Sequence, residues 1–178
     1  ADAVIFLLDA GMSNFKDTDI EFLTGSDKKS IFSRDHVIFL LSKSDKLDEE
    51  RRKRQTETLR KRLGESVPDL RGAIFLPMSA GVQRIIDSMS DTEFQTLFSH
   101  IKDNLSDEDD ICLDVPSMFP EYTERLADLK KRCSTQWNVA QIVVRSILSS
   151  EDCLQARRKL EDMSGFSGLR KELDRIFF

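Results

Sequence analysis

One short polar segment combines residue types that suit the recognition of a nucleobase. It reads Ser42-Lys43-Ser44-Asp45 and directly follows the apolar residues 37–41. A carboxylate such as that of Asp45 can accept two neighbouring hydrogens at once, and guanine offers such a pair on N1 and its exocyclic amino group, whereas adenine does not. The alkyl stem of Lys43 can lie on the plane of a base, and Ser42 can tie the loop to its neighbours. The segment therefore predicts a guanine-binding loop.

A second candidate segment, Ser79-Ala80-Gly81, follows the apolar residues 73–78. A tight turn of small residues can present a backbone N–H that donates to the carbonyl oxygen of guanine. The two segments lie one strand-and-helix unit apart, so we expect them on adjacent loops at the same edge of a sheet. Ligands bind at this carboxyl edge in open α/β folds. One base could then contact both segments.

Three apolar runs predict the strands that position these loops. Residues 4–8 and 37–41 are continuous apolar runs with β-branched members, as in strands buried on both faces, and residues 73–78 are a weaker example. Helical patterns separate them at residues 17–23 and 49–63, the second with Leu59 and Leu63 as its expected inner contacts. This alternation predicts an α/β fold with a parallel sheet and flanking helices.

The remainder of the chain has mainly helical periodicity. Residues 82–105 predict two helices that break near Ser90-Asp91, and the helix predicted at residues 122–148 is too apolar to lie free on a surface. The other expected segments are an acidic surface loop (106–110), an irregular connector (111–120), a helix (151–163), a cap and restart (164–168) and a final helix (169–178).

The composition of the chain limits the functions that it can have. The chain has 178 residues, of which 39% are hydrophobic, and its net charge is −5. This length allows one main domain with a helical appendage, and the acidic balance argues against nucleic acid as a partner. Cys112, Cys133 and Cys153 are widely spaced and form no CxxC pair, which predicts reduced thiols and a cytoplasmic location. No apolar run is long enough to span a bilayer.

The two polar segments resemble motifs of a known family. Residues 42–45 resemble the [NTS]KxD base-recognition motif of translation-factor-class P-loop GTPases, and Ser79-Ala80 resembles their following SA motif. The nearest subfamily is the bacterial dynamin-like GTPases, in which a segment of the type ADAVLFVLDA precedes the base motif. Residues 164–173 resemble the SGxxxLxxxL helix that closes their domain, and the helix with residues 137–140 resembles the penultimate helix of that group.

The resemblance implies a fold, a ligand and a set of binding residues. The fold would be the second half of a P-loop GTPase-like three-layer sandwich, in residues 1–105, with a connector and closing helices of the same domain in residues 106–178. Guanine in GTP or GDP would be bound by the following residues: Ser42, Lys43, Asp45, Ser79 and Ala80. A dynamin-like parent could act peripherally on a membrane through regions outside this chain, since nothing in these residues shows a membrane contact.

Two elements of the family pattern are missing from these residues. There is no GxxxxGK[ST] phosphate loop and no DxxG element, and in the family both precede the strand that corresponds to residues 4–8. We therefore expect a chain cut in mid-domain that does not hydrolyse GTP by itself, with Mg²⁺ bound only by the intact parent. Left without its other neighbour, the strand at residues 4–8 would be an apolar edge, so we expect self-association through it or folding together with the missing half.

Other interpretations remain beside this one. The main alternative is a non-enzymatic interaction module, a degenerate G-domain half whose apolar helix at residues 137–148 binds a partner helix or another protomer. Asp9 suits a Mg²⁺ or phosphate ligand, but an Asp that ends a strand is more often a helix cap or a turn former, and we favour the cap. The acidic residues 107–110 lack the spacing of a calcium loop. His36 and His100 have no nucleophile placed beside them by sequence, so we expect no catalytic triad.

Overall fold

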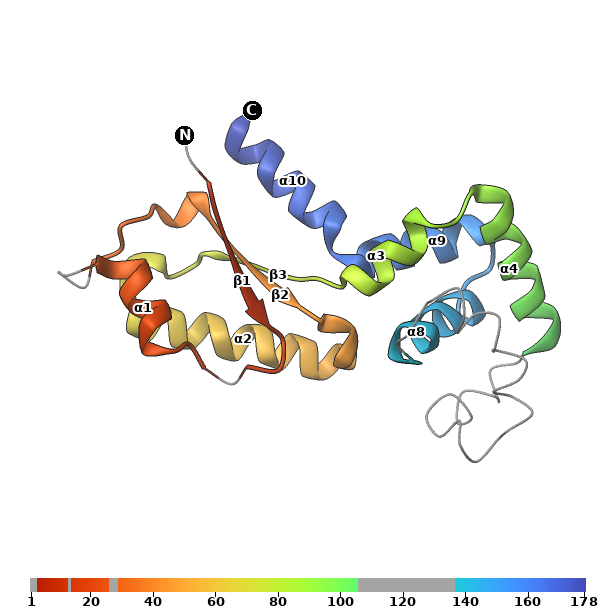
Figure 1. Cartoon of the computed structure of the whole chain (residues 1–178), viewed down its shortest axis with the longest axis horizontal. Coiled ribbons are helices and arrows are strands. Elements are labelled where there is room, and N and C mark those ends of the chain that lie inside the picture. Colours follow the sequence, from red (N-terminus) through yellow and green to blue (C-terminus); the bar gives the residue numbers. More distant parts are fainter. Residues whose placement is uncertain (1–2, 13, 26–28, 106–136) are drawn as a thin grey trace. The chain divides into compact units, whose positions relative to one another are not determined.

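The computed structural model describes residues 3–12, 14–25, 29–105 and 137–178. The chain divides into two compact units, and Figure 1 shows the elements of each. The first unit comprises Ala1–Ser79 together with Gly165–Phe178, and the second comprises Ala80–Ser164. The last helix of the chain therefore belongs with the strands that come first in the sequence.

The first unit contains a parallel three-stranded sheet. Its strands are β1 (Val4–Asp9), β2 (Val37–Ser42) and β3 (Ile74–Pro77), in the order β1-β2-β3. Asp9 lies opposite Ser42 in the register, and Leu41 lies opposite Pro77. The carboxyl ends of the three strands are therefore aligned. These findings confirm the three predicted strands and their parallel arrangement. They also bring the loops after β2 and β3 to the same edge of the sheet.

Helices α1 (Asp17–Thr24) and α2 (Glu49–Ser66) cover one face of this sheet. Leu59 and Leu63 of α2 are fully buried, as the sequence predicts, and Phe39 of β2 stacks on Phe75 of β3 with ring centroids 4.7 Å apart. Asp48 caps the start of α2 by accepting a hydrogen bond from the backbone N–H of Arg51. Short 3₁₀ turns connect the elements of this unit, at Arg34–His36, Ser44–Lys46 and Pro68–Leu70.

Helix α10 (Phe166–Phe177) lies against the opposite face. Gly168 approaches Leu76 of β3, whose register partner on β2 is the buried Leu40. The helix begins three residues earlier than the sequence predicts, because Gly165 has a φ of 78° and turns the chain directly into it. The unit thus has helices on both faces of a parallel sheet, which confirms the predicted class of mixed α/β fold.

β1 differs from the prediction that it would be buried on both faces. Ile5 and Leu7 are 46% and 62% exposed, whereas Leu8 is buried against the α1 and α2 side. Among the described residues β1 pairs only with β2, so it is an edge strand. The prediction holds for β2, the central strand, in which Val37 to Leu41 are all buried.

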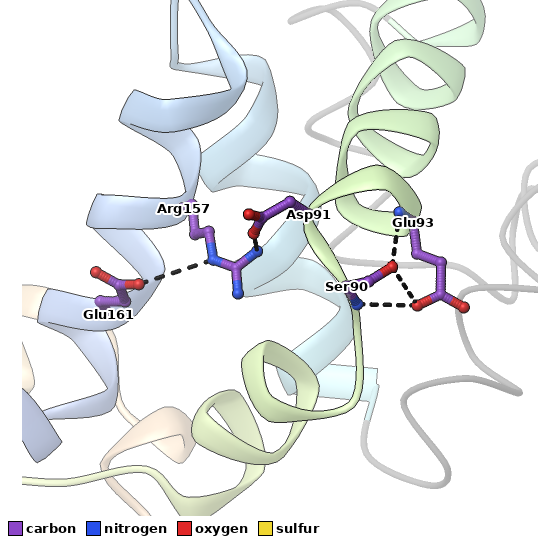
Figure 2. Close-up of polar contacts among 5 residues, drawn as sticks. All are labelled: Ser90, Asp91, Glu93, Arg157 and Glu161. Atoms are coloured by element: carbon purple, nitrogen blue, oxygen red, sulfur yellow. Dashed lines mark hydrogen bonds and ion pairs between the residues drawn. The ribbon is translucent and has the colours of Figure 1, made fainter.

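The second unit is helical in its described part. It contains α3 (Ala80–Asp87), α4 (Asp91–Asn104), α8 (Trp137–Leu148) and α9 (Cys153–Ser164). The predicted break near Ser90-Asp91 is confirmed. Ser90 starts α4 by accepting a hydrogen bond from the Glu93 backbone N–H, while the Glu93 carboxylate accepts one from the Ser90 backbone N–H at 2.9 Å (Figure 2).

The helices of this unit share one hydrophobic core. α8 contributes the buried Val139, Ala140, Val143, Val144 and Ile147, which confirms that this apolar helix packs against other parts of the chain. At the edge of the core, the Arg157 Nη1 atom lies 2.5 Å from an Asp91 carboxylate oxygen and the Nε atom 3.8 Å from a Glu161 one, as Figure 2 shows.

Several predicted features lie outside the described residues. They are the acidic loop at 106–110, the connector at 111–120, the first part of the helix predicted at 122–148, and the thiols of Cys112 and Cys133. No helix in the part of the chain that the structure describes is long and apolar enough to cross a membrane.

Candidate functional site

The first unit brings the predicted binding residues to one end of its sheet. Ser42 is the last residue of β2, Lys43 follows it, and Asp45 lies in the 3₁₀ turn Ser44–Lys46. Ser79 follows β3, and the exposed Ala80 is the first residue of α3. We call the loops after β1, β2 and β3 in the first unit, with Asp9, Ser42–Asp45 and Ser79, the carboxyl edge.

Asp45 and Ser79 join the second and third of these loops. The Ser79 Oγ donates a hydrogen bond of 2.7 Å to Asp45 Oδ1, and both residues are buried, with 9% and 1% of their surface exposed. The backbone reinforces this link, because Ser44 N donates to Met78 O at 3.1 Å and Met78 N donates to Leu41 O at 2.8 Å. The Asp45 carboxylate is therefore held in one position by the loop beside it.

Ser42 joins the first and second loops. Its Oγ donates a hydrogen bond of 2.8 Å to the backbone oxygen of Leu8 on β1, and its own backbone oxygen accepts one of 2.9 Å from Ala10 N. The side chain thus ties the loop to its neighbour, as we expect from the sequence. Ser44, the next serine, is buried, and its Oγ has no hydrogen-bond partner among the described residues.

Lys43 forms an ion pair with Asp9 at the end of β1. The Lys43 Nζ lies 2.7 Å from Asp9 Oδ2, and Asp9 Oδ1 accepts a hydrogen bond of 2.9 Å from Gly11 N. The hydrogen bond from Lys43, followed by that from Gly11, holds the pKa of the Asp9 carboxyl below its usual value. The same hydrogen bond to Asp9 raises the pKa of the Lys43 ammonium. Both groups are therefore charged across the neutral range.

The role of Asp9 corrects one expectation. The helix cap is wrong, because α1 begins only at Asp17; Asp9 instead forms a turn with Gly11, the other common role of an Asp after a strand, and pairs with Lys43. Sequence reasoning missed this pairing. The signal that could have found it is the alignment of two adjacent parallel strands, because Asp9 is the register partner of Ser42 and so lies beside the residue that follows Ser42.

No family model, curated protein or solved structure matches this chain. The assignment of a function therefore depends on the carboxyl edge itself.

The other side chains singled out from the sequence give no second site. His36 ends the 3₁₀ turn Arg34–His36, and His100 lies in α4 with Asn104 beside its ring. Cys153 is partly buried as a free thiol, and burial raises its pKa, which disfavours the reactive thiolate. Within the described ranges no three His, Cys, Asp or Glu side chains are grouped so that they could hold a metal ion.

Proposed function

We propose that the carboxyl edge is the base-recognition part of a guanine-nucleotide site, and that the first unit is the second half of a P-loop GTPase-like sandwich. The observation that carries the proposal is the buried Asp45 carboxylate, which Ser79 of the neighbouring loop holds in place. In the intact protein, such a site would bind GTP and GDP within a dynamin-like hydrolytic cycle.

The chemistry of Asp45 suits guanine. An ionised carboxylate has about four acceptor positions, so the hydrogen bond from Ser79 is compatible with two further hydrogens from N1 and the exocyclic amino group. Because Asp45 is buried, each of these hydrogen bonds would form in a medium of low dielectric constant, where charge-assisted contacts are strong. Adenine has no matching pair of hydrogens and would leave the carboxylate poorly paired.

The neighbouring residues support the same ligand. Ser42 ties β1 to β2, and Ser79 places the following backbone N–H, that of Ala80, at the same end of β3. That N–H would donate to the guanine carbonyl oxygen. The alkyl stem of Lys43 would contact the base plane. No residue of the described chain is assigned to the phosphates or to Mg²⁺, and the proposal gives this chain no catalytic residue.

Nucleotide binding by the full-length protein tests the proposal. We expect fluorescent GDP to bind with micromolar or tighter affinity, and unlabelled ADP not to displace it. Asp45→Asn replaces one acceptor oxygen by an N–H donor that faces guanine hydrogens, so it should weaken GDP binding at least about 30-fold, the equivalent of about 2 kcal/mol. If neither nucleotide binds, the guanine site is wrong.

Two controls make this test specific. Asp48→Asn removes a nearby carboxylate that caps α2, a role that Asn also fills, and it should leave GDP binding unchanged. Xanthine has a carbonyl where guanine has its amino group, so Asp45→Asn should bind fluorescent xanthosine diphosphate more tightly than the unaltered protein does. If Asp45→Asn binds GDP more weakly and does not bind xanthosine diphosphate more tightly than the unaltered protein, the substitution has damaged the fold and has not changed one contact.

The alternative of an interaction module gains no support from α8. The apolar residues that would meet a partner helix are buried in the core of the second unit, where α8 packs against α3, α4 and α9. Their periodicity in the sequence is explained by this internal packing. The guanine site is therefore the function that the described residues support best.

A further inference from the structure

The pairing of Lys43 with Asp9 fixes a side chain that would otherwise be free to move. Asp9 uses one carboxylate oxygen for the turn at Gly11 and the other for the Lys43 ammonium. Turn formation needs only the first of these oxygens. The second contact, at 2.7 Å, joins the loop after β1 to the loop that contains Asp45.

The backbone of Lys43 is held in an unusual conformation that goes with this contact. Lys43 has a φ of 59°, and it is the one residue other than glycine with a positive φ among those described. This left-handed conformation is costly for a residue with a Cβ, and it persists where neighbouring contacts impose it. Here Lys46 N donates to the Lys43 backbone oxygen at 3.1 Å, and Ser44 N is bonded to Met78 O.

The result is a lysine whose two ends are both fixed. Its backbone lies two residues before the buried Asp45, while its ammonium lies at the end of β1, so the alkyl stem extends along the carboxyl edge from β2 toward β1. Asp9 neutralises the charge of the Lys43 ammonium. The alkyl stem of Lys43 is therefore the part that is suited to a ligand. A flat apolar surface such as the face of a nucleobase is the partner that such a stem fits.

We propose that Asp9 is a positioning residue for the guanine site, which holds Lys43 in place before the base arrives. This inference rests on the proposed function. A free lysine must lose its rotamer freedom when a base binds, whereas a lysine already paired with Asp9 has lost part of it. Asp9 itself contacts no nucleotide. Its effect on affinity passes through Lys43, so the two residues should not act independently.

Equilibrium binding of fluorescent GDP to the full-length protein tests this proposal with four proteins: the unaltered one, Asp9→Asn, Lys43→Ala and the double variant. Asp9→Asn keeps an oxygen for the hydrogen bond from Gly11 N and removes the charge that holds Lys43. We expect it to weaken GDP binding by about 3- to 10-fold, the cost of ordering one long side chain. In the Lys43→Ala background the same substitution should change the affinity less than twofold, because there is no lysine left to position.

A matched control separates this effect from a general loss of charge. Asp35→Asn removes a carboxylate that is exposed before the opposite end of β2, where it pairs with Arg34, and it should leave GDP binding unchanged. Unfolding midpoints of all variants show whether each still folds.

The outcomes distinguish this inference from the function on which it rests. If the unaltered protein binds no GDP, both the guanine site and the role of Asp9 are wrong. If it binds GDP and Asp45→Asn abolishes binding while Asp9→Asn has no effect, only the role of Asp9 is wrong. If Asp9→Asn weakens binding equally with and without Lys43, Asp9 acts by another route and positioning through Lys43 is overturned.

Discussion

Asp45 and Ser79 are 34 positions apart in the chain, yet they share a buried hydrogen bond. The sequence predicts that they meet, because each follows a strand of the same parallel sheet. It predicts the pairing of Lys43 with Asp9 less directly, because the alignment of β1 with β2 brings the two residues close without selecting this contact. Several acidic residues are within reach of a surface lysine, and the choice among them depends on rotamers that only the folded loops determine. The left-handed backbone of Lys43 has no local sequence signal either.

Ser44 leads to a prediction about stability. Its buried Oγ has lost its hydrogen bonds to water and gains none from the described protein, so Ser44→Ala should raise the free energy of unfolding by about 1 kcal/mol. Urea denaturation measures this change. Ser150→Ala is the matched contrast, because the buried Ser150 Oγ donates to Ser146 O at 2.6 Å, and its loss should lower stability by about 1 kcal/mol. A destabilising effect of Ser44→Ala would show that this hydroxyl has a partner.

The pair of Lys43 and Asp9 should make stability depend on pH. Folding lowers the pKa of Asp9 below its ordinary value of 3.8. The ion pair therefore stabilises the folded state fully above pH 3.8, and this stabilisation is lost as the pH falls through the pKa of Asp9 in the folded state. Folding raises the pKa of Lys43 above its ordinary value of 10.5. The same stabilisation is therefore complete below pH 10.5 and is lost as the pH rises through the pKa of Lys43 in the folded state. The difference in unfolding midpoint between the unaltered protein and Asp9→Asn should therefore disappear at both extremes. It should also be small, and smaller in high salt, because 56% of the Lys43 side chain and 43% of the Asp9 side chain are exposed to solvent.

At the scale of elements, the apolar runs predict all three strands, and the position of Ser90 predicts the start of α4. The errors concern features that depend on distant parts of the chain. β1 has the same apolar composition as β2, but its burial depends on which elements cover it, and Ile5 and Leu7 remain exposed. α10 begins at Phe166 because Gly165 adopts a left-handed conformation against β3. The sequence predicts a cap at residues 164–168 but not the residue at which the helix begins.

Gly165 should tolerate no side chain. Its φ of 78° disfavours any Cβ, and a Cβ there would lie 2.1 Å from the backbone oxygen of Pro77. We expect Gly165→Ala to lower the free energy of unfolding by more than about 2 kcal/mol. Gly72→Ala is the control, since Gly72 has a similar φ of 88° with no atom near its added Cβ, and it should cost about 1 kcal/mol from the conformation alone. Equal effects of the two substitutions in urea denaturation would mean that α10 can shift away from β3.

At the scale of the whole molecule, the exposed edge of β1 predicts self-association of this chain. Ile5 and Leu7 are apolar and exposed, and among the described residues the strand pairs on one side only. Sedimentation velocity should show species larger than a monomer at micromolar concentration, and Leu7→Lys should shift the distribution toward monomer by adding a charge to the edge. Thr58→Lys, on the exposed surface of α2, is the control, because it adds the same single positive charge away from β1. A monomer at all concentrations would contradict this prediction.

The close approach of Gly165 to Pro77 also bears on the order in which the protein folds during its synthesis. The ribosome must make the entire second unit between these two residues before α10 emerges, so α10 cannot cover the face of the sheet with Ile38 and Leu40 during that time. A nascent chain halted after Ser164 would lack α10 and would leave this apolar surface without the helix that covers it in the folded unit.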